Sequence, residues 1–373
     1  MEWNDYRLID VLDALIDYRG KTPKKCDSGV PLITAKIIKN GTIGTPTEFI
    51  AYEDYDSWMV RGFPEIGDVV LTTEAPLGEV AQLQSKDIAL AQRVVTLRGK
   101  KGVLDNTFLK YFFLSHEGHQ RLVARETGTT VTGIKQSELR EVLITCPSYQ
   151  DQRRIAAILS SLDDKIENNN RIIRNLEAQA QALFKSWFVD FEPWGGTMPE
   201  DWKEGTLGDI IEERPKSKIQ VNAAKDVRGK YPFFTSGNSI YEYNEALVSG
   251  RNVFLNTGGA AGIEFYVGEA SYSTDTWCIK GVDNFTDYLY LYLLSILKII
   301  NTEYFEGSAL KHLKKKPFKE RAIIIPTHRI INDFNKIVVS IFDMIMDNYS
   351  ESHRLAALRD TLLPKLMKGE ITL

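Results

Sequence analysis

The chain contains one long stretch twice, and this duplication constrains the fold more than any other feature. The first copy begins at Pro147 and the second at Pro326, 179 residues later, and they align without a gap. Each opens with Pro followed by Ser or Thr, which is typical of a helix N-terminus. At the rise of an α-helix, each copy is long enough for roughly ten turns. The sequence therefore predicts two long helices, within residues 148–193 and 326–373.

Apolar residues in the first copy recur in alternating steps of four and three, which is the spacing of a heptad a/d seam. The seam returns in the second copy with three polar interruptions. Two helices with matching seams in one chain most simply pack on each other, so we expect a coiled coil. The seam positions are Ile155, Leu159, Leu162, Ile166, Asn169, Ile173, Leu176, Ala180, Leu183 and Trp187, and then Phe334, Val338, Ile341, Ile345, Asn348, Ser352, Leu355, Arg359, Leu362 and Leu366.

The segment before each long helix mixes strand-like runs with one helical stretch, and the two segments resemble each other weakly. Pro31-Leu32-Ile33-Thr34 is matched by Pro232-Phe233-Phe234-Thr235, and the amphipathic stretch from Phe108 to Leu122 is matched by residues 285–300. The order globule, helix, globule, helix predicts a two-fold internal repeat of α/β (α+β) globules. The predicted domains are residues 1–147 and 194–325 for the globules, and residues 148–193 and 326–373 for the helices.

The order of these segments also predicts their topology. The first helix carries the chain away from the first globule, and a second helix that leaves a similar globule in the same way runs back. We therefore expect an antiparallel pair with a pseudo-two-fold axis through its middle, and chain ends that lie near each other.

Composition narrows the class of protein. The net charge of −4 argues against a uniformly basic surface, so any nucleic-acid site must be local. Cys26, Cys146 and Cys278 stand far apart and indicate neither a zinc site nor a disulfide framework. The longest apolar run is too short to span a bilayer and no signal peptide is recognisable, so we expect a cytoplasmic protein.

No catalytic motif is recognisable. The Gly-rich stretch from Thr257 to Gly262 lacks the Lys and Ser/Thr of a phosphate-binding loop. His116 and His119 share a helix face, but nothing nearby supports a metal site, and we expect them at the surface. Asp163-Asp164-Lys165 resembles a nuclease carboxylate pair, yet it lies on the long helix, where a solvated face is the simpler interpretation. The sequence favours a binding protein, not an enzyme, with no metal and no catalytic residue.

Local basic runs recur at similar places in the two globules. Lys and Arg neutralise phosphates, and neighbouring Thr or Asn side chains can read base edges. Each run alone is as easily a solvated loop, but their recurrence favours DNA binding. The candidate DNA-binding residues are Lys21, Thr22, Lys24, Lys25, Thr73, Thr129 and Lys135 in the first globule, and Lys216, Lys218, Lys230, Asn256, Lys311 and Lys314 in the second.

Two further groups on the helices are candidates for other roles. Phe184, Trp187, Phe188 and Phe191 cluster where the first helix ends. They either pack that end on the second globule or contribute to docking a partner. Asn169 and Asn348 occupy equivalent seam positions. If the pair is antiparallel with its midpoint near residue 171, Asn169 lies opposite Ser352, and this polar layer costs stability but fixes the register.

The chain resembles the specificity subunit of type I restriction–modification systems. The resemblance rests on QDQRRIAAILSSLDDKIENNNRIIRNLEAQAQALFKSWFVDFEP in the first helix, LRDTLLPKLMKGEI closing the second, Gly20-Lys21-Thr22-Pro23 and Gly67-Asp68-Val69-Val70-Leu71-Thr72. It implies that each globule is a target recognition domain for one half of a bipartite duplex DNA site. It also implies that the helices separate the half-sites and dock two methylation subunits, which carry S-adenosylmethionine, while restriction (motor) subunits carry ATP, Mg²⁺ and the nuclease.

Two other classes of function stay open at this point. The chain can be a coiled-coil scaffold whose globules bind protein, which salt-dependent DNA binding with the methylation subunit present would distinguish. It can also be a stand-alone methyltransferase, against which the missing cofactor motifs argue. On the DNA-binding interpretation, a seam of ~50 Å holds the two half-sites roughly one duplex turn apart.

Overall fold

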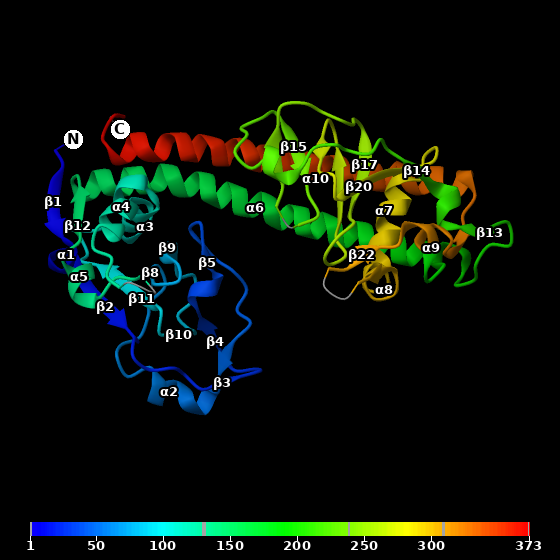
Figure 1. Cartoon of the computed structure of the whole chain (residues 1–373). Coiled ribbons are helices and arrows are strands. Elements are labelled where there is room, and N and C mark those ends of the chain that lie inside the picture. Colours follow the sequence, from blue (N-terminus) through cyan, green and yellow to red (C-terminus); the bar gives the residue numbers. More distant parts are fainter. Residues whose placement is uncertain (1, 129–131, 238, 308–309, 372) are drawn as a thin grey trace. The chain divides into compact units, whose positions relative to one another are not determined.

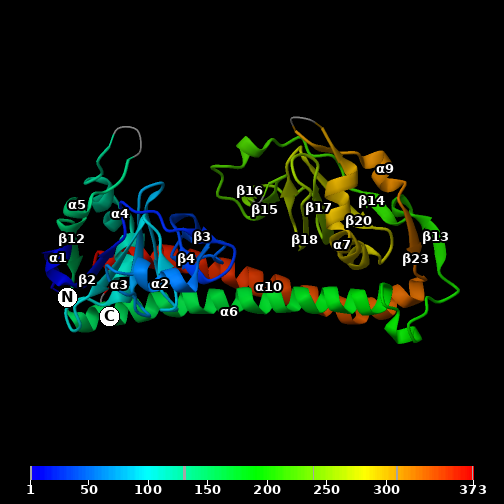
Figure 2. The ribbon, with the colours of Figure 1, turned by 90° about the horizontal axis from the view of Figure 1, so that it is seen from below.

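The structure is a computed structural model of the chain, and it describes every residue except 1, 129–131, 238, 308–309 and 372. It consists of two compact units (Figures 1 and 2). Unit 1 comprises Met1–Ile166 with His353–Leu373, and unit 2 comprises Glu167–Ser352. Each unit therefore contains one globule together with a stretch of each long helix.

Unit 1 is built on two four-stranded sheets. The first is antiparallel, in the order β2 (Leu12–Asp17), β11 (Val94–Gly99), β8 (Val69–Thr73) and β9 (Leu77–Gln82). The second has the order β10 (Ala89–Leu90), β4 (Val30–Ile33), β7 (Phe49–Ile50) and β3 (Lys25–Cys26), with β4 and β10 parallel. The remaining elements are β1 (Asn4–Arg7) paired with β12 (Leu143–Cys146), β5 (Ile38–Lys39) paired with β6 (Thr42–Ile43), and the short helices α1 (Leu8–Val11), α2 (Tyr55–Trp58) and α5 (Gln136–Arg140).

Unit 2 repeats this arrangement. Its antiparallel sheet has the order β14 (Ile211–Glu213), β20 (Thr276–Gly281), β17 (Arg251–Asn256) and β18 (Ile263–Val267). Its smaller sheet has the order β16 (Tyr241–Tyr243), β15 (Tyr231–Phe234) and β19 (Ser271–Tyr272), with β15 and β19 parallel. The remaining elements are β13 (Lys203–Thr206) paired with β23 (Ala322–Ile325), β21 (Phe305–Glu306) paired with β22 (His312–Leu313), and α9 (Lys315–Lys319). The common strand order confirms the predicted internal repeat.

The central strand of each globule is buried on both faces, which explains its run of three apolar residues, Val69 to Leu71 in β8 and Val253 to Leu255 in β17. Val69 and Leu71 of β8 face one hydrophobic core of unit 1, and Val70 between them faces the other. In unit 2, Val253 of β17 faces the core shared with the helices, while Phe254 faces a smaller second core. Consecutive apolar residues suit a strand that is buried on both faces, because successive side chains point to opposite sides.

The helical stretch of each globule packs beside the sheet. Each stretch was predicted as one helix, and each is divided into two in the structure. Residues 108–122 form two helices, α3 (Asn106–Leu114) and α4 (His116–Val123), because Ser115 leaves the helical conformation and its hydroxyl caps α4 at Gly118 N. In unit 2 the stretch forms α7 (Thr286–Ser295) and the short α8 (Leu297–Ile299), followed by a π-helical turn at Ile300–Tyr304.

The two long helices are α6 (Tyr149–Phe188) and α10 (His328–Met367). In unit 1 Arg359 of α10 donates to Asp163 of α6 over 2.8 Å, and in unit 2 the rings of Phe334 and Trp187 lie 5.7 Å apart. Late residues of α10 thus meet early residues of α6, and early residues of α10 meet late ones, so the predicted antiparallel coiled coil is confirmed. Every predicted seam position is buried or partly buried.

Both chain ends belong to unit 1 and lie together, as predicted (Figure 1). Gly369, just beyond α10, lies directly against the indole of Trp3. In the part of the chain that the structure describes, no helix has the length and apolarity that crossing a membrane requires.

Candidate nucleic-acid interface

A junction of loops closes one end of the central sheet in unit 1. At the end of β8, the carbonyl oxygen of Thr73 accepts a hydrogen bond from Ile134 N at 2.9 Å, and Gly133 bridges to Glu74. The amide of Thr73 donates to Arg93 O at 3.0 Å, which fixes the turn before β11. These bonds bring together the loops around residues 74–76, 92–93 and 133–135, and the Thr22 hydroxyl joins them by donating to Gln92 Oε1.

Unit 2 has the same junction. Leu313 N donates to Thr257 O at 3.0 Å, and His312 bridges to Gly258. Thr257 N donates to Asp275 O at 3.0 Å. Leu313 and Asp275 therefore hold the places that Ile134 and Arg93 hold in unit 1. The two junctions therefore share one arrangement of backbone hydrogen bonds, but the side chains at equivalent positions differ.

The predicted cations of unit 1 lie on this side of the globule. They differ in whether their charge is free or paired with a carboxylate. Lys21, Lys24 and Lys135 are exposed. Lys25 forms an ion pair with Glu48 at 2.6 Å, and Lys36 approaches the same carboxylate at 3.5 Å. The Glu48 carboxylate thus partly neutralises the charge of Lys25 within the globule. Lys25 and Lys36 line a hollow of about 270 Å³ that also includes Thr22, Ala75, Gln92 and Arg93.

The predicted cations of unit 2 divide into two places. Lys216, Lys218 and Lys311 are exposed, and Lys311 belongs to the junction because its carbonyl oxygen accepts from Gly259 N. Lys314 is 3.6 Å from Glu306. Lys230 precedes β15, at the strand end opposite to the junction, where Nζ lies 4.0 Å from Glu269 and over the ring of Tyr231. Lys230 therefore does not join the other cations.

Three of the remaining candidates are placed by their hydrogen bonds. The Thr22 hydroxyl is exposed and donates to Gln92 Oε1 at 2.9 Å. Asn256 is partly exposed, and its side chain donates to Ala260 O at 3.2 Å, inside its own turn. Thr73 is only 1% exposed, and its hydroxyl donates to Arg93 O. A side chain buried this far cannot reach DNA, so Thr73 is removed from the interface. Thr129 lies outside the described residues.

The structure adds Arg93, which the basic runs did not indicate, and it places Lys315, which belongs to the basic run from Lys311 to Lys319. Arg93 stands alone in the sequence but lies at the junction, where its Nε is 2.8 Å from Glu74 Oε1. Lys315 lies over the ring of Trp277 at 4.5 Å, and burial lowers the pKa of its ammonium group. Arg93 has no charged neighbour in the sequence, so it does not belong to any basic run. Arg93 is located by its backbone position instead, since its carbonyl oxygen accepts from Thr73 N as that of Asp275 accepts from Thr257 N.

The polar layer of the coiled coil exists, but its pairing differs from the prediction. Asn169 is fully buried, and its Nδ2 donates to Glu351 Oε2 at 2.7 Å, one residue before the expected Ser352. Asn169 Oδ1 and Ser352 Oγ are buried without a hydrogen-bond partner among the described residues. Asn348 is partly exposed and donates to Met344 O in its own helix. The equivalent positions therefore have unequal environments.

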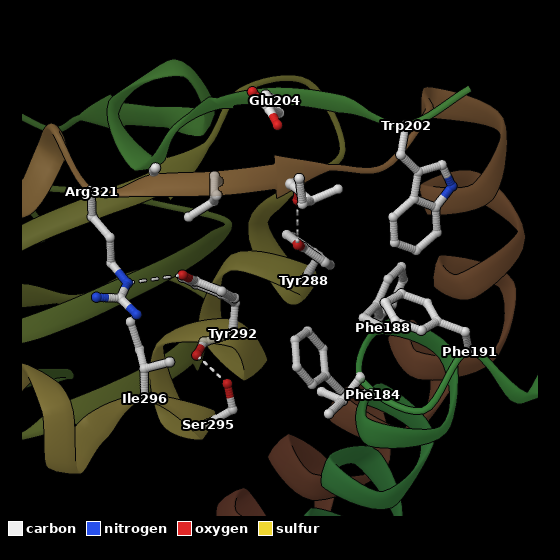
Figure 3. A pocket seen from close by; sticks show the side chains of 14 residues that line it. Phe184, Phe188, Phe191, Trp202, Glu204, Tyr288, Tyr292, Ser295, Ile296 and Arg321 are labelled. Carbon is white, nitrogen blue, oxygen red and sulfur yellow. Dashed lines mark hydrogen bonds between the residues drawn. The ribbon is translucent and has the colours of Figure 1, made fainter. Parts of the chain in front are cut away.

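The aromatic cluster at the end of α6 is packed inside unit 2 (Figure 3). Phe188 is 9% exposed, and its ring lies 4.8 Å from that of Tyr288 and 4.9 Å from that of Phe334. Phe184 is 3% exposed, and Phe191 packs edge-on against Trp202. Packing of the helix end on its globule accounts for these contacts. The four predicted partner-binding residues, Phe184, Trp187, Phe188 and Phe191, belong to the core or its margin.

A half-buried ion pair ties α3 to both long helices in unit 1. Asp163 accepts from Tyr111 at 2.5 Å and from Arg359 at 2.8 Å, and Lys110 Nζ lies at 3.4 Å. Burial alone would raise the pKa of the Asp163 carboxyl, but the bonds from Tyr111 and Arg359 and the charge of Lys110 lower it below its ordinary value. The interpretation of Asp163 as part of a solvated face is therefore wrong, whereas Asp164 is exposed.

A corresponding network holds the globule of unit 2 to α10. Arg251 forms ion pairs of 2.7 Å with Asp287 and 2.8 Å with Asp343. Burial raises the pKa of Asp287, although the guanidinium of Arg251 opposes that shift. Within the described residues, no group of three or more His, Cys, Asp or Glu side chains is placed to hold a metal ion.

Two repeated α/β units on paired long helices, each with the same loop junction, form the duplicated architecture that the sequence predicted. A family model described as the type I restriction modification DNA specificity domain matches residues 1–178 and again residues 199–358. The chain therefore belongs to the family of type I restriction–modification specificity subunits.

Similar proteins agree with this assignment. The chain is 28% identical to the type I restriction enzyme MjaIX specificity subunit of Methanocaldococcus jannaschii, over 92% of this chain and 87% of that protein. It is 25% identical to the HindI specificity subunit of Haemophilus influenzae, over 71% and 77%. The crystal structure of a type I restriction–modification S subunit from M. genitalium has the same fold, with a TM-score of 0.64 at 19% identity, over 98% of this chain and 96% of that one.

Proposed function

We propose that this chain is the DNA-recognition subunit of a type I restriction–modification complex, in which each unit reads one half of a bipartite duplex target. The observation that carries the proposal is the duplicated junction. Two surfaces with the same backbone frame, formed around Thr73 and Thr257, carry different exposed side chains. Such a pair suits a protein that reads two different short sequences in the same manner.

The charge distribution supports DNA as the ligand. Lys21 and Lys135 are exposed on the junction side of unit 1, and Lys311 is exposed at the junction of unit 2. Phosphate contacts from such lysines supply affinity and hold the register, while base edges are read by the loops between them. The net charge of −4 confines the attraction to these places.

An apolar stripe on α10 supports the docking of methylation subunits. Ile337 and Met344 are one heptad apart and are 45% and 50% exposed. Exposed apolar residues at heptad spacing suit a further helix laid along the pair. In this proposal the chain itself is not catalytic. The two methylation subunits supply S-adenosylmethionine chemistry, and restriction subunits supply ATP-driven movement, Mg²⁺ and cleavage.

The experiment is a binding titration of the chain with its methylation subunits on duplex DNA over a range of salt concentrations. Affinity should fall linearly on a double-logarithmic plot and should be highest for one bipartite sequence. Binding that is independent of salt and sequence would instead favour the alternative, a coiled-coil scaffold with protein-binding globules.

A further inference from the structure

Arg93 and Asp275 occupy the same backbone position in the two junctions. In unit 1 the carbonyl oxygen of Arg93 accepts from Thr73 N at 3.0 Å, and in unit 2 that of Asp275 accepts from Thr257 N at 3.0 Å. The Thr257 hydroxyl also donates to Asp275 O at 2.6 Å. The backbone at both positions is therefore fixed to the end of the central strand.

The side chains at this position are exposed and chemically opposite. Arg93 is held by Glu74 through its Nε at 2.8 Å, with the two side chains 48% and 36% exposed. This ion pair orients the planar guanidinium at the rim of the hollow that Thr22 and Gln92 also line. Asp275 is exposed as well and presents a carboxylate. Arg93 can only donate hydrogen bonds, and an ionised Asp275 can only accept them.

A carboxylate at a DNA-binding junction is informative because it repels phosphate. In contact with DNA, an acidic side chain gains energy from a donor on a base edge and not from phosphate, and in the major groove the amino group of cytosine is the donor that Asp and Glu accept from. Guanine, in contrast, presents two acceptors that match the fork of an arginine. Exchanging the two side chains on one backbone frame would therefore exchange the base that is read.

We infer that Arg93 and Asp275 are specificity-determining residues, with Arg93 reading a guanine in one half-site and Asp275 a cytosine in the other. The inference rests on the proposed function and assigns base readers within it. Lys21 and Lys311, which flank the same junctions, contact phosphate and carry no preference for sequence.

The test is a selection from duplexes with randomised half-sites, made with the complex of this chain and its methylation subunits. Arg93→Ala should reduce discrimination at one G·C pair of one half-site by roughly 5- to 150-fold and leave the other half-site unchanged. Asp275→Asn should alter preference at one pair in the opposite half-site. Arg93→Lys, which keeps the charge beside Glu74, should lose most of the discrimination while retaining non-specific affinity.

Lys21→Ala is the matched control, since the loss of a phosphate contact weakens binding to all sequences alike. The inference is overturned if the Arg93 and Asp275 variants also weaken every sequence equally, or if they leave the selected sequences unchanged. A wild-type complex that selects no sequence at all would instead overturn the proposed function.

Discussion

Asn169 is a polar residue in the buried seam of the coiled coil, and we expect it to lower the stability of the helix pair. Its amide oxygen is buried without a described partner, although its nitrogen bonds to Glu351. Replacing it with Leu removes the unpaired oxygen and adds apolar contact, whereas Glu351 is partly exposed and can turn to water. We expect Asn169→Leu to raise the free energy of unfolding by about 1 kcal/mol in a urea titration. Because the layer fixes the register, the variant should also discriminate less between half-site spacings.

Asn348→Leu is the control for this prediction. It changes the equivalent heptad position, but the side chain is partly exposed and already bonded to Met344 O. Its effect should stay within about 0.5 kcal/mol. A destabilised Asn169→Leu protein, with spacing preference unaltered, would show that the buried Asn is not a register-fixing layer.

Asp163 should make stability depend on pH. Its folded-state pKa is lowered, so its contribution is complete above the ordinary aspartate value near 4 and is lost as the pH falls through the folded value. Asp163→Asn leaves Lys110, only 7% exposed, without its carboxylate and should cost about 2 kcal/mol at pH 7. The difference from the wild type should shrink as the pH falls below about 4.

Urea unfolding at several pH values measures this difference. The exposed neighbour Asp164 provides the comparison, since Asp164→Asn should change stability little at any pH. Equal effects of the two substitutions at pH 7 would mean that the network around Asp163 contributes nothing.

Individual lysines of the basic runs should differ in how much they contribute to DNA affinity, because the structure places them at different ends of unit 2. Lys311→Ala should weaken binding to every duplex and reduce the slope of log affinity against log salt by about one unit. Lys230→Ala should change neither quantity, because Lys230 lies at the opposite end of β15 and near Glu269. The pair is measured by salt titration of the complex. A loss at Lys230 equal to that at Lys311 would place the interface elsewhere on unit 2.

At the scale of elements, the long helices could be predicted well and the junctions could not. A heptad repeat is local and periodic, so the spacing from Ile155 to Trp187 defines the buried face without knowledge of the rest of the chain. The junctions depend on hydrogen bonds between residues far apart in sequence, such as Thr73 and Ile134. The burial of Thr73 and the separation of Lys230 follow from strand order, which composition does not encode.

The outer face of α10 yields a prediction for docking. Met344→Glu places a charge on the exposed apolar stripe and should abolish co-purification with the methylation subunit while the thermal melt is preserved. Ser350→Glu adds the same charge at an exposed position on a different face of the same helix and should have no effect. Retained co-purification in the Met344 variant, and in the double variant with Ile337→Glu, would exclude this stripe as the docking surface.

At the scale of the whole molecule, the weak matches between the two halves of the sequence were enough to predict the repeated globules and the antiparallel helices. The match of Pro31–Thr34 to Pro232–Thr235 locates β4 and β15, which hold equivalent places in sheets of the same topology. The order of globules and helices then required an antiparallel pair, as the contacts of Asp163 with Arg359 confirm. The recognised sequence does not follow from the internal matches, since the loops that we propose to read bases are those in which the two globules diverge.

The central claim is that each unit reads its own half of a bipartite target. The most direct measurement replaces residues 195–325 with the matching part of a relative and determines the methylated sequences in cells that express the chimera with its methylation subunits. The account predicts that one half-site changes, while the other half-site and the spacing between them stay the same, because unit 1 and the paired helices are retained. A chimera that alters both half-sites, or that keeps the original target, would contradict it.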